Sequence, residues 1–365
     1  MMHKLISLAF SSDVAEPLSL AALSQLVLAQ QNRLAVLEQQ LVQEATHDNV
    51  ISAAKILMRT CVQTQFQPQF ALTEGSGVDV SSLGQEVFRL DLDELGYPRS
   101  EVSGHEKRFV RGLMIEGKHV LVLPRFHPYE KKENQAYAVD NALRKNTFGA
   151  RLASLVGVET MVFTTACGVI YSREQDGQSD LPVQLGNVFS IDQFVTVGQT
   201  FGVLDPSEVL KGFYAKGVAA SSEWGSQLKA PRSDRNYFDS FPQPDKDLSA
   251  QARQAPTLDA KVAIRHIQTP GPNYEERGVK QALMVYARPG QPVAVSMSTQ
   301  SEAIAAGFLG IKTVAFGIAT NIEYGDAEHK APNHAEVKEQ VGHASSRLNI
   351  ILAEFFKGAA GPVKT

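Results

Sequence analysis

The chain has 365 residues, a formal net charge of -4, 20% charged residues and 43% hydrophobic residues. This composition is that of an ordinary globular protein with a large core, and it excludes a disordered chain. The slight acidity gives no reason to expect a nucleic-acid partner. Because the two cysteines form neither a metal-type spacing nor a disulfide framework, we expect reduced thiols in a cytoplasm. No apolar run reaches the length of a membrane span.

The N-terminal segment is predicted to be helical. Leucines recur near one stripe of a helix from Ser19 onward, and Pro17 stands just before it, where a helix can start. We expect residues 1–48 to form a helical extension, which either packs on its own domain or contacts a helix of another subunit.

Short apolar runs alternate with helical stretches from Phe70 onward. FALTEGSG leads into a loop, and Glu116-Gly117-Lys118 joins the runs FVRGLMI and HVLVL in a hairpin. Further strands are predicted at TMVFTTACG, KVAIRHIQ, PVAVSM (ending at Met297) and KTVAFGIATN (ending at Thr320-Asn321). Helices are predicted at about 134–156, EERGVKQALMVYAR, SEAIAAGFLG and about 333–357.

Residues 173–256 are richer in Gly, Pro, Asp and Ser, and we expect mostly loop there, with one helix near 207–218. Strands that alternate with helices predict an α/β fold: a single domain with a central mixed β-sheet flanked by helices. This domain is predicted to span 49–358, and 359–365 to form a C-terminal tail.

Polar side chains follow the apolar run HVLVL within the segment LPRFHPYEKK. Arg125, His127 and Tyr129 come just past the end of this predicted strand, a usual place for ligand contacts in an α/β sheet. The arginine fork suits phosphate oxygens. A surface turn with solvated charges is the alternative for this segment taken alone.

Other segments also suit an anion. Ser76 lies in a Gly-Ser-Gly turn whose amides and hydroxyl can hold phosphate oxygens. Ser298 precedes a predicted helix start, where amides favour an anion, and Thr299 with Glu302 matches a capping box. His105 lies in a loop after a glycine. The alternatives are a plain glycine turn, structural capping and a surface histidine.

A second group of residues could bind a polar heterocycle. Tyr274 and Glu275 follow a Gly-Pro turn, Asn321 ends a predicted strand, and His334 stands at a helix start. An amide can donate and accept at once, although Asn321 could simply form an Asx turn. No metal site is predicted, because His329 and His334 have no evident third ligand.

Seven ordered segments together resemble the trimeric family of purine nucleoside phosphorylases, which includes methylthioadenosine phosphorylases. They are GSG, YPRSEVSGHEKRF, RFHPYE, LVGVETMVFTTACG, GPNYEE, AVSMSTQSEAIAAGFLGIKTVAFGIATN and NHAEV, and the resemblance covers about 49–356. It implies a pentosyltransferase, a glycosyltransferase that uses phosphate to convert a purine nucleoside into free purine and ribose 1-phosphate in purine salvage. It also implies a cytoplasmic homotrimer that needs no cofactor besides inorganic phosphate as co-substrate, and no nucleic-acid or membrane partner.

The resemblance assigns a role to each candidate residue. Phosphate would be bound by Ser76, His105, Arg125, His127, the Ala166 amide and Ser298. The nucleoside would be bound by Tyr129, Tyr274, Glu275, Met297, Asn321 and His334. The expected catalytic residues are Glu275, Asn321 and His127. An amide at Asn321 implies 6-oxopurines, because an aspartate marks the 6-aminopurine enzymes of the family.

Several positions depart from the family's pattern. Val78-Asp79 replaces further glycines after the phosphate turn, Thr165 stands where asparagine is usual, and Val169 and Ser296 replace glycines. These departures leave open other substrates, such as xanthosine or methylthio-nucleosides, or a non-catalytic nucleoside-binding homologue. Phe194 and Phe201 are the candidates for an aromatic ring that a neighbouring subunit contributes to the site.

Overall fold

The computed structural model describes residues 49–99, 107–126, 145–171, 181–195, 242–269, 283–284, 286–287, 290–323 and 334–359. Three predicted helices fall wholly or mostly outside these residues: the one from Ser19, the one at 207–218 and the one at 275–288.

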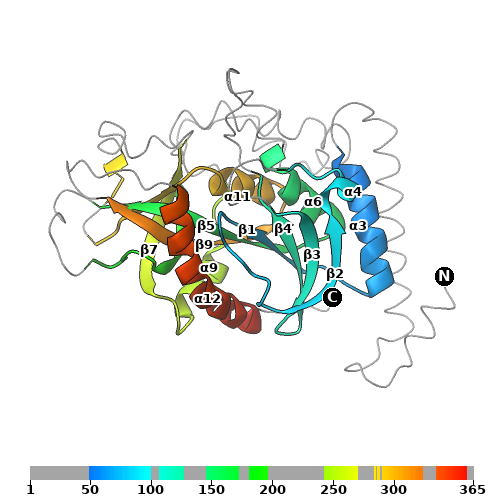
Figure 1. The fold of residues 1–365 in the computed structure, drawn as a ribbon. Coiled ribbons are helices and arrows are strands. Elements are labelled where there is room, and N and C mark those ends of the chain that lie inside the picture. The colour runs from blue at the N-terminus through cyan, green and yellow to red at the C-terminus, as the bar shows by residue number, and fades with distance from the viewer. Residues whose placement is uncertain are drawn as a thin grey trace, which may run out of the picture.

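A nine-stranded mixed sheet forms the centre of the described structure (Figure 1). Its strands are β1 (Phe70–Glu74), β2 (Gln85–Asp91), β3 (Phe109–Ile115), β4 (Lys118–Pro124), β5 (Thr160–Ile170), β6 (Val188–Val195), β7 (Ala260–Gln268), β8 (Val293–Ser296) and β9 (Lys312–Glu323). The order is β2-β3-β4-β1-β5-β8-β7-β6-β9, and β9 also pairs with β5. Strands β5, β8, β7, β6 and β9 therefore close into a ring, from which β1, β4, β3 and β2 extend.

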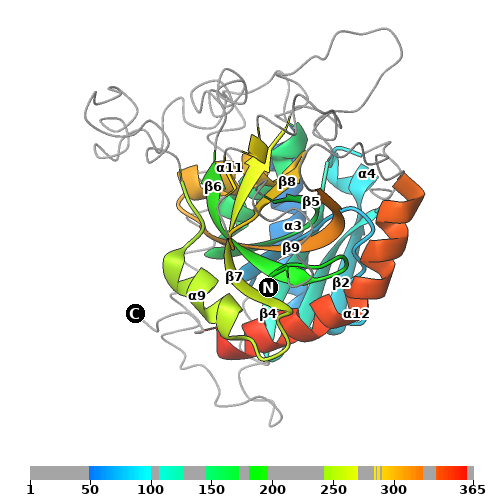
Figure 2. The same ribbon diagram turned by 90° about the vertical axis from the view of Figure 1, so that its left-hand side faces the viewer.

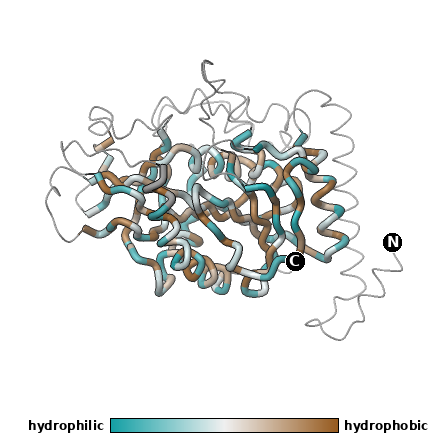
Figure 3. Tube along the Cα trace, viewed as in Figure 1, coloured by the Kyte–Doolittle hydropathy of each residue, from teal (hydrophilic) through white to brown (hydrophobic). Residues whose placement is uncertain are grey.

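Helices cover both faces of this sheet, as Figures 1 and 2 show. One core cluster includes residues of α3 (Val50–Thr64), α6 (Phe148–Val156), α11 (Thr299–Phe308) and the short α4 (Leu92–Leu95). A second includes residues of α9 (Lys246–Gln254) and α12 (His334–Gly358). Figure 3 shows that hydrophobic residues concentrate along the central strands. The predicted α/β domain with a mixed sheet is confirmed.

The predicted hairpin is also confirmed, and it explains where β4 ends. Glu116 (φ 48°) and Gly117 (φ 73°) both occupy the left-handed region that a tight two-residue turn requires. The turn pairs Ile115 with Lys118, and the apolar strand β4 then runs to Pro124. Arg125 therefore lies just past the end of a buried strand.

The segment predicted as mostly loop contains β6 and α9. A polar residue of β6 finds its hydrogen-bond partner on another strand: the Asp192 carboxylate accepts the N–H of Ile264 on β7 at 3.1 Å. Helix α9 has few apolar residues, and it begins because the Asp245 carboxylate accepts the N–H groups of Asp247 and Leu248. The prediction did not include these two elements, because composition was its only guide.

Parallel pairing brings four strand ends to one edge of the sheet. Strand β1 runs parallel to β4 and β5, and β5 runs parallel to β9. Strand β8 is antiparallel to β5 and pairs with its last three residues, Val295 facing Gly168. It ends at Ser296, one residue earlier than predicted, whereas β9 continues to Glu323.

Within the described residues, no helix has the length and apolar character to cross a membrane.

A buried histidine on β7 makes stability depend on pH. The Nε2 atom of His266 lies 2.8 Å from Ser296 Oγ, and the residue is fully buried. Burial lowers the pKa of His266 from 6.5 to about 3, so the folded state keeps it neutral while the unfolded chain binds a proton. As the pH falls from about 6.5 toward about 3, the free energy of unfolding should decrease, by up to a few kcal/mol.

Denaturant unfolding of the wild type and of His266→Gln, from about pH 7 to about pH 4, checks this. Because glutamine does not titrate, the stability advantage of the wild type should shrink on acidification. A constant difference between the two proteins across that range would contradict the prediction.

Candidate active site

Thr164, in the middle of β5, holds the turn that follows β1. Its hydroxyl accepts the N–H of Gly75 at 2.9 Å and donates to the Thr73 carbonyl at 2.9 Å. A Cβ atom on Gly75 would lie only 2.4 Å from the Thr164 carbonyl oxygen, so this approach requires glycine. The Gly-Ser-Gly turn is thereby fixed against β5, with Ser76 half-buried within it.

Arg125 is buried beside the same threonine. Its Nη1 donates to the Thr164 carbonyl oxygen at 2.8 Å, and its Nε donates to the carboxylate of Glu302 at 2.5 Å. Its Nη2 is buried and has no hydrogen-bond partner among the described residues. Because leaving a buried guanidinium N–H group without an acceptor is costly, Nη2 is suited to bind an anionic oxygen.

Glu302 on α11 neutralises this arginine. Its side chain is 3% exposed and that of Arg125 is 1% exposed, so the ion pair is removed from water. Burial raises the pKa of Glu302 from 4.5 to about 7, although the Arg125 guanidinium opposes that shift. Removing either partner would leave an uncompensated group in the core.

The capping box predicted for Thr299 and Glu302 is absent. Ser298 occupies the N-cap position of α11, so Glu302 is the fourth helical residue instead of the third. Its carboxylate turns to Arg125. One turn of α11 therefore places Ser298 and the arginine's partner close together.

Ser298 is buried, and its hydroxyl makes no capping hydrogen bond. It lies at the N-terminus of α11, where backbone amides and the helix dipole favour an anion. The half-buried Met297 precedes it, and the half-buried Ala166 lies on β5, two residues after Thr164. The described part of the predicted phosphate site is thus brought together around Thr164.

A bulge in β9 places Asn321. Along the β5–β9 pairing, Cys167 faces Ala319 and Gly168 faces Asn321, so Thr320 has no partner on β5. The Thr320 hydroxyl bonds to the Cys167 carbonyl at 3.1 Å instead. Asn321 is buried, and its Nδ2 donates to Glu323 at 3.2 Å, which fixes the orientation of the amide.

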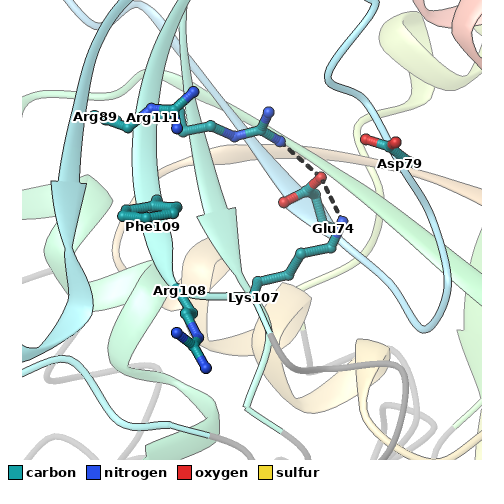
Figure 4. A pocket seen from close by; sticks show the side chains of 7 residues that line it. All are labelled: Glu74, Asp79, Arg89, Lys107, Arg108, Phe109 and Arg111. Atoms are coloured by element: carbon teal, nitrogen blue, oxygen red, sulfur yellow. Dashed lines mark hydrogen bonds and ion pairs between the residues drawn. The ribbon is translucent and has the colours of Figure 1, made fainter.

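A basic pocket lies beside the end of β1 (Figure 4). It is lined by Glu74, Asp79, Arg89, Lys107, Arg108, Phe109 and Arg111. Arg111 and Lys107 both pair with the buried Glu74, at 2.9 Å and 3.4 Å. Two of the four cations of this pocket therefore already have a carboxylate partner within it, whereas the buried Nη2 of Arg125 has no acceptor among the described residues.

The same pocket accounts for Asp79, the departure next to the phosphate turn. Its carboxylate accepts the N–H of Ser81 at 2.9 Å and faces the pocket (Figure 4). That hydrogen bond, together with the charges of Lys107 and Arg111, lowers the pKa of Asp79 despite partial burial. Its negative charge is thus screened by cations.

Other predicted site residues lie outside the described residues: His105, His127, Tyr129, Tyr274, Glu275 and Phe201. For His334 the structure gives the backbone, which begins α12. Phe194 is buried within its own subunit, with its ring 5.8 Å from that of His266. We therefore do not expect Phe194 to reach a neighbouring site.

Three residues of the site were missed in the sequence. Glu302 was assigned to a helix cap, and Thr164 and Glu323 were passed over. The roles of Glu302 and Thr164 depend on contacts between residues far apart in the chain, such as the 177 positions that separate Arg125 from Glu302. The one local signal was a glutamate on a helix otherwise composed of uncharged residues.

Comparisons with known proteins identify the family to which the chain belongs. Residues 69–357 match the family model of the phosphorylase superfamily. Mouse purine nucleoside phosphorylase is 27% identical over 316 residues, covering 84% of this chain and 93% of the mouse protein. The Cellulomonas purine nucleoside phosphorylase is 28% identical over 294 residues, covering 78% of this chain and 84% of that protein.

Solved structures show the same fold. Schistosoma mansoni purine nucleoside phosphorylase in complex with inosine has a TM-score of 0.63 and 19% identity, covering 87% of this chain and 99% of that one. The complex with adenosine has a TM-score of 0.60 at 19% identity, with the same coverage. The chain belongs to the phosphorylase superfamily, and within it to the enzymes of the purine nucleoside phosphorylase type.

Proposed function

We propose that this enzyme catalyses phosphorolysis of 6-oxopurine ribonucleosides and deoxyribonucleosides, giving free purine and the pentose 1-phosphate. The observation that carries the proposal is the buried Nη2 of Arg125, which has no acceptor among the described residues. It lies beside the turn that holds Ser76 and near the α11 N-terminus at Ser298, two further groups suited to a phosphate dianion.

The chemistry follows from these charges. Cleavage of the glycosidic bond makes the sugar cationic and the purine anionic. Phosphate held by Ser76, Arg125 and Ser298, together with His105 and His127, stabilises the cation and then attacks the anomeric carbon. This is positioning with electrostatic stabilisation, so neither a protein nucleophile nor a cofactor is required.

Recognition of the base is assigned to Asn321 and Glu275. The Asn321 amide donates to the ring nitrogen and carbonyl side of the purine as negative charge grows, while Glu275 accepts a ring N–H. Tyr274 stacks on the base, and Tyr129, Met297 and His334 contact the ribose. The Schistosoma protein has been solved with inosine and with adenosine, so the preference for 6-oxopurines rests on the amide of Asn321.

We infer further that the enzyme acts in purine salvage in the cytoplasm as a homotrimer. The two buried, unpaired cysteines Cys61 and Cys167 suit a reducing compartment. The trimer is supported by the family resemblance alone.

The reaction itself is the first prediction. Hypoxanthine release from inosine should require phosphate, and adenosine should react about ten- to a hundredfold more slowly, as expected for one charge-assisted hydrogen bond. Release without phosphate would indicate a hydrolase. Nucleoside binding without turnover would support a non-catalytic homologue, and faster release from xanthosine or a methylthio-nucleoside would replace the proposed substrate.

Asn321→Asp should shift the preference toward adenosine. The new carboxyl lies next to Glu323, and two adjacent carboxyl groups retain a proton that can be donated to a 6-aminopurine. The measurement is the ratio of kcat/KM for adenosine to that for inosine. Asn187→Asp, in a turn where aspartate can also accept the Gln184 N–H, is the control and should leave this ratio unchanged.

Arg125→Lys should raise the KM for phosphate about ten- to a hundredfold with a smaller effect on the KM for inosine, because one ammonium cannot satisfy Thr164, Glu302 and phosphate together. The control is Arg111→Lys, which alters an arginine paired with the buried Glu74 in the basic pocket. Equal increases in the phosphate KM of both variants would contradict the assignment of Arg125.

A further inference from the structure

The N-terminus of α11 is capped by a neighbouring strand. In an ordinary helix the N-cap serine accepts the N–H of the second or third helical residue. Here the N–H of Ser301, the third residue of α11, donates to the side-chain oxygen of Gln268 at 2.9 Å. Ser298 makes no side-chain capping bond, and its backbone (ψ -24°) departs from the extended conformation typical of an N-cap.

Gln268 is held so that its amide meets this helix end. It is the last residue of β7, is buried, and pairs with Ser296 on β8. Its own N–H donates to the side-chain oxygen of Gln300 at 3.0 Å, and its side-chain Nε2 donates to the Ser301 hydroxyl at 3.1 Å. Both polar atoms of the Gln268 side chain are therefore engaged by Ser301.

The same contact extends to the end of β4. The Ser301 hydroxyl lies 2.6 Å from Oδ1 of Asn146, and Asn146 Nδ2 donates to the Phe126 carbonyl at 2.8 Å. Phe126 directly follows Arg125 in the chain. Gln268, Ser301 and Asn146 thus connect the helix end at Ser298 to the strand end at Arg125 through buried hydrogen bonds.

We propose that Gln268 is a positioning residue that caps α11 in place of Ser298 and thereby keeps the Ser298 hydroxyl for the phosphate oxygens. This inference rests on the proposed function. A serine hydroxyl that accepts a backbone N–H at its own helix end points back toward the helix. By supplying the acceptor from β7, the fold leaves this hydroxyl to donate to an anion at the helix N-terminus.

The test replaces Gln268 with methionine, which has similar length and offers no comparable acceptor. In Gln268→Met the Ser298 hydroxyl should turn to the Ser301 N–H, and the Kd for inorganic phosphate, measured by titration calorimetry on the full chain, should rise about tenfold. The phosphate KM should rise in parallel while the nucleoside KM changes little. Gln251→Met, which removes a bond to the Phe355 carbonyl, is the matched control and should leave phosphate affinity unchanged.

A double-mutant cycle on thermal stability tests the capping exchange without reference to activity. Ser298→Ala should leave the melting temperature unchanged in the wild type, because no capping bond is lost. In the Gln268→Met background the same substitution should lower it, because Ser298 has become the cap. Equal shifts in both backgrounds would overturn the proposal.

The two readouts separate this inference from the proposed function. If the stability cycle gives the expected coupling but Gln268→Met binds phosphate as tightly as the wild type, the positioning role is wrong even where phosphorolysis is confirmed. If the wild type binds phosphate and Gln268→Met loses affinity but no nucleoside is cleaved, the positioning role holds and the proposed reaction fails.

Discussion

A buried arginine needs its charge neutralised and its N–H groups accepted, and the site is organised around this requirement for Arg125. Glu302 supplies the countercharge from α11, and the Thr164 carbonyl supplies an acceptor from β5. The same threonine fixes the turn after β1 through Gly75. One residue in the middle of the sheet therefore sets the spacing between a strand end, a glycine turn and a helix end.

The cations near the end of β1 differ in how their N–H groups are paired. Lys107 and Arg111 share the buried carboxylate of Glu74, so each has an ionic partner within the pocket. Arg125 is also paired, yet its Nη2 is buried and has no hydrogen-bond acceptor among the described residues. This difference, more than the number of positive charges, marks Arg125 as the group suited to an anion.

The position of Asn321, the residue proposed to bind the purine base, depends on a bulge in β9. Closure of five strands into a ring brings β9 beside β5, and the bulge at Thr320 then turns Asn321 so that it meets Gly168. Without the extra residue, alternation along the strand would place the amide on the other face. Glu323, two positions further, fixes the orientation that results.

The sequence by itself determined the α/β class, the hairpin before Arg125, the strands carrying Thr164 and Asn321, and the order of segments that resembles the phosphorylases. These features are local, because apolar runs, turn residues and helix periodicity act over a few neighbouring positions. Only the tertiary structure decided that Glu302 pairs with Arg125, that Gln268 caps α11, and that Asp79 faces cations. Those contacts join residues far apart in the chain, and a buried polar group accepts whichever partner the packed fold brings within reach.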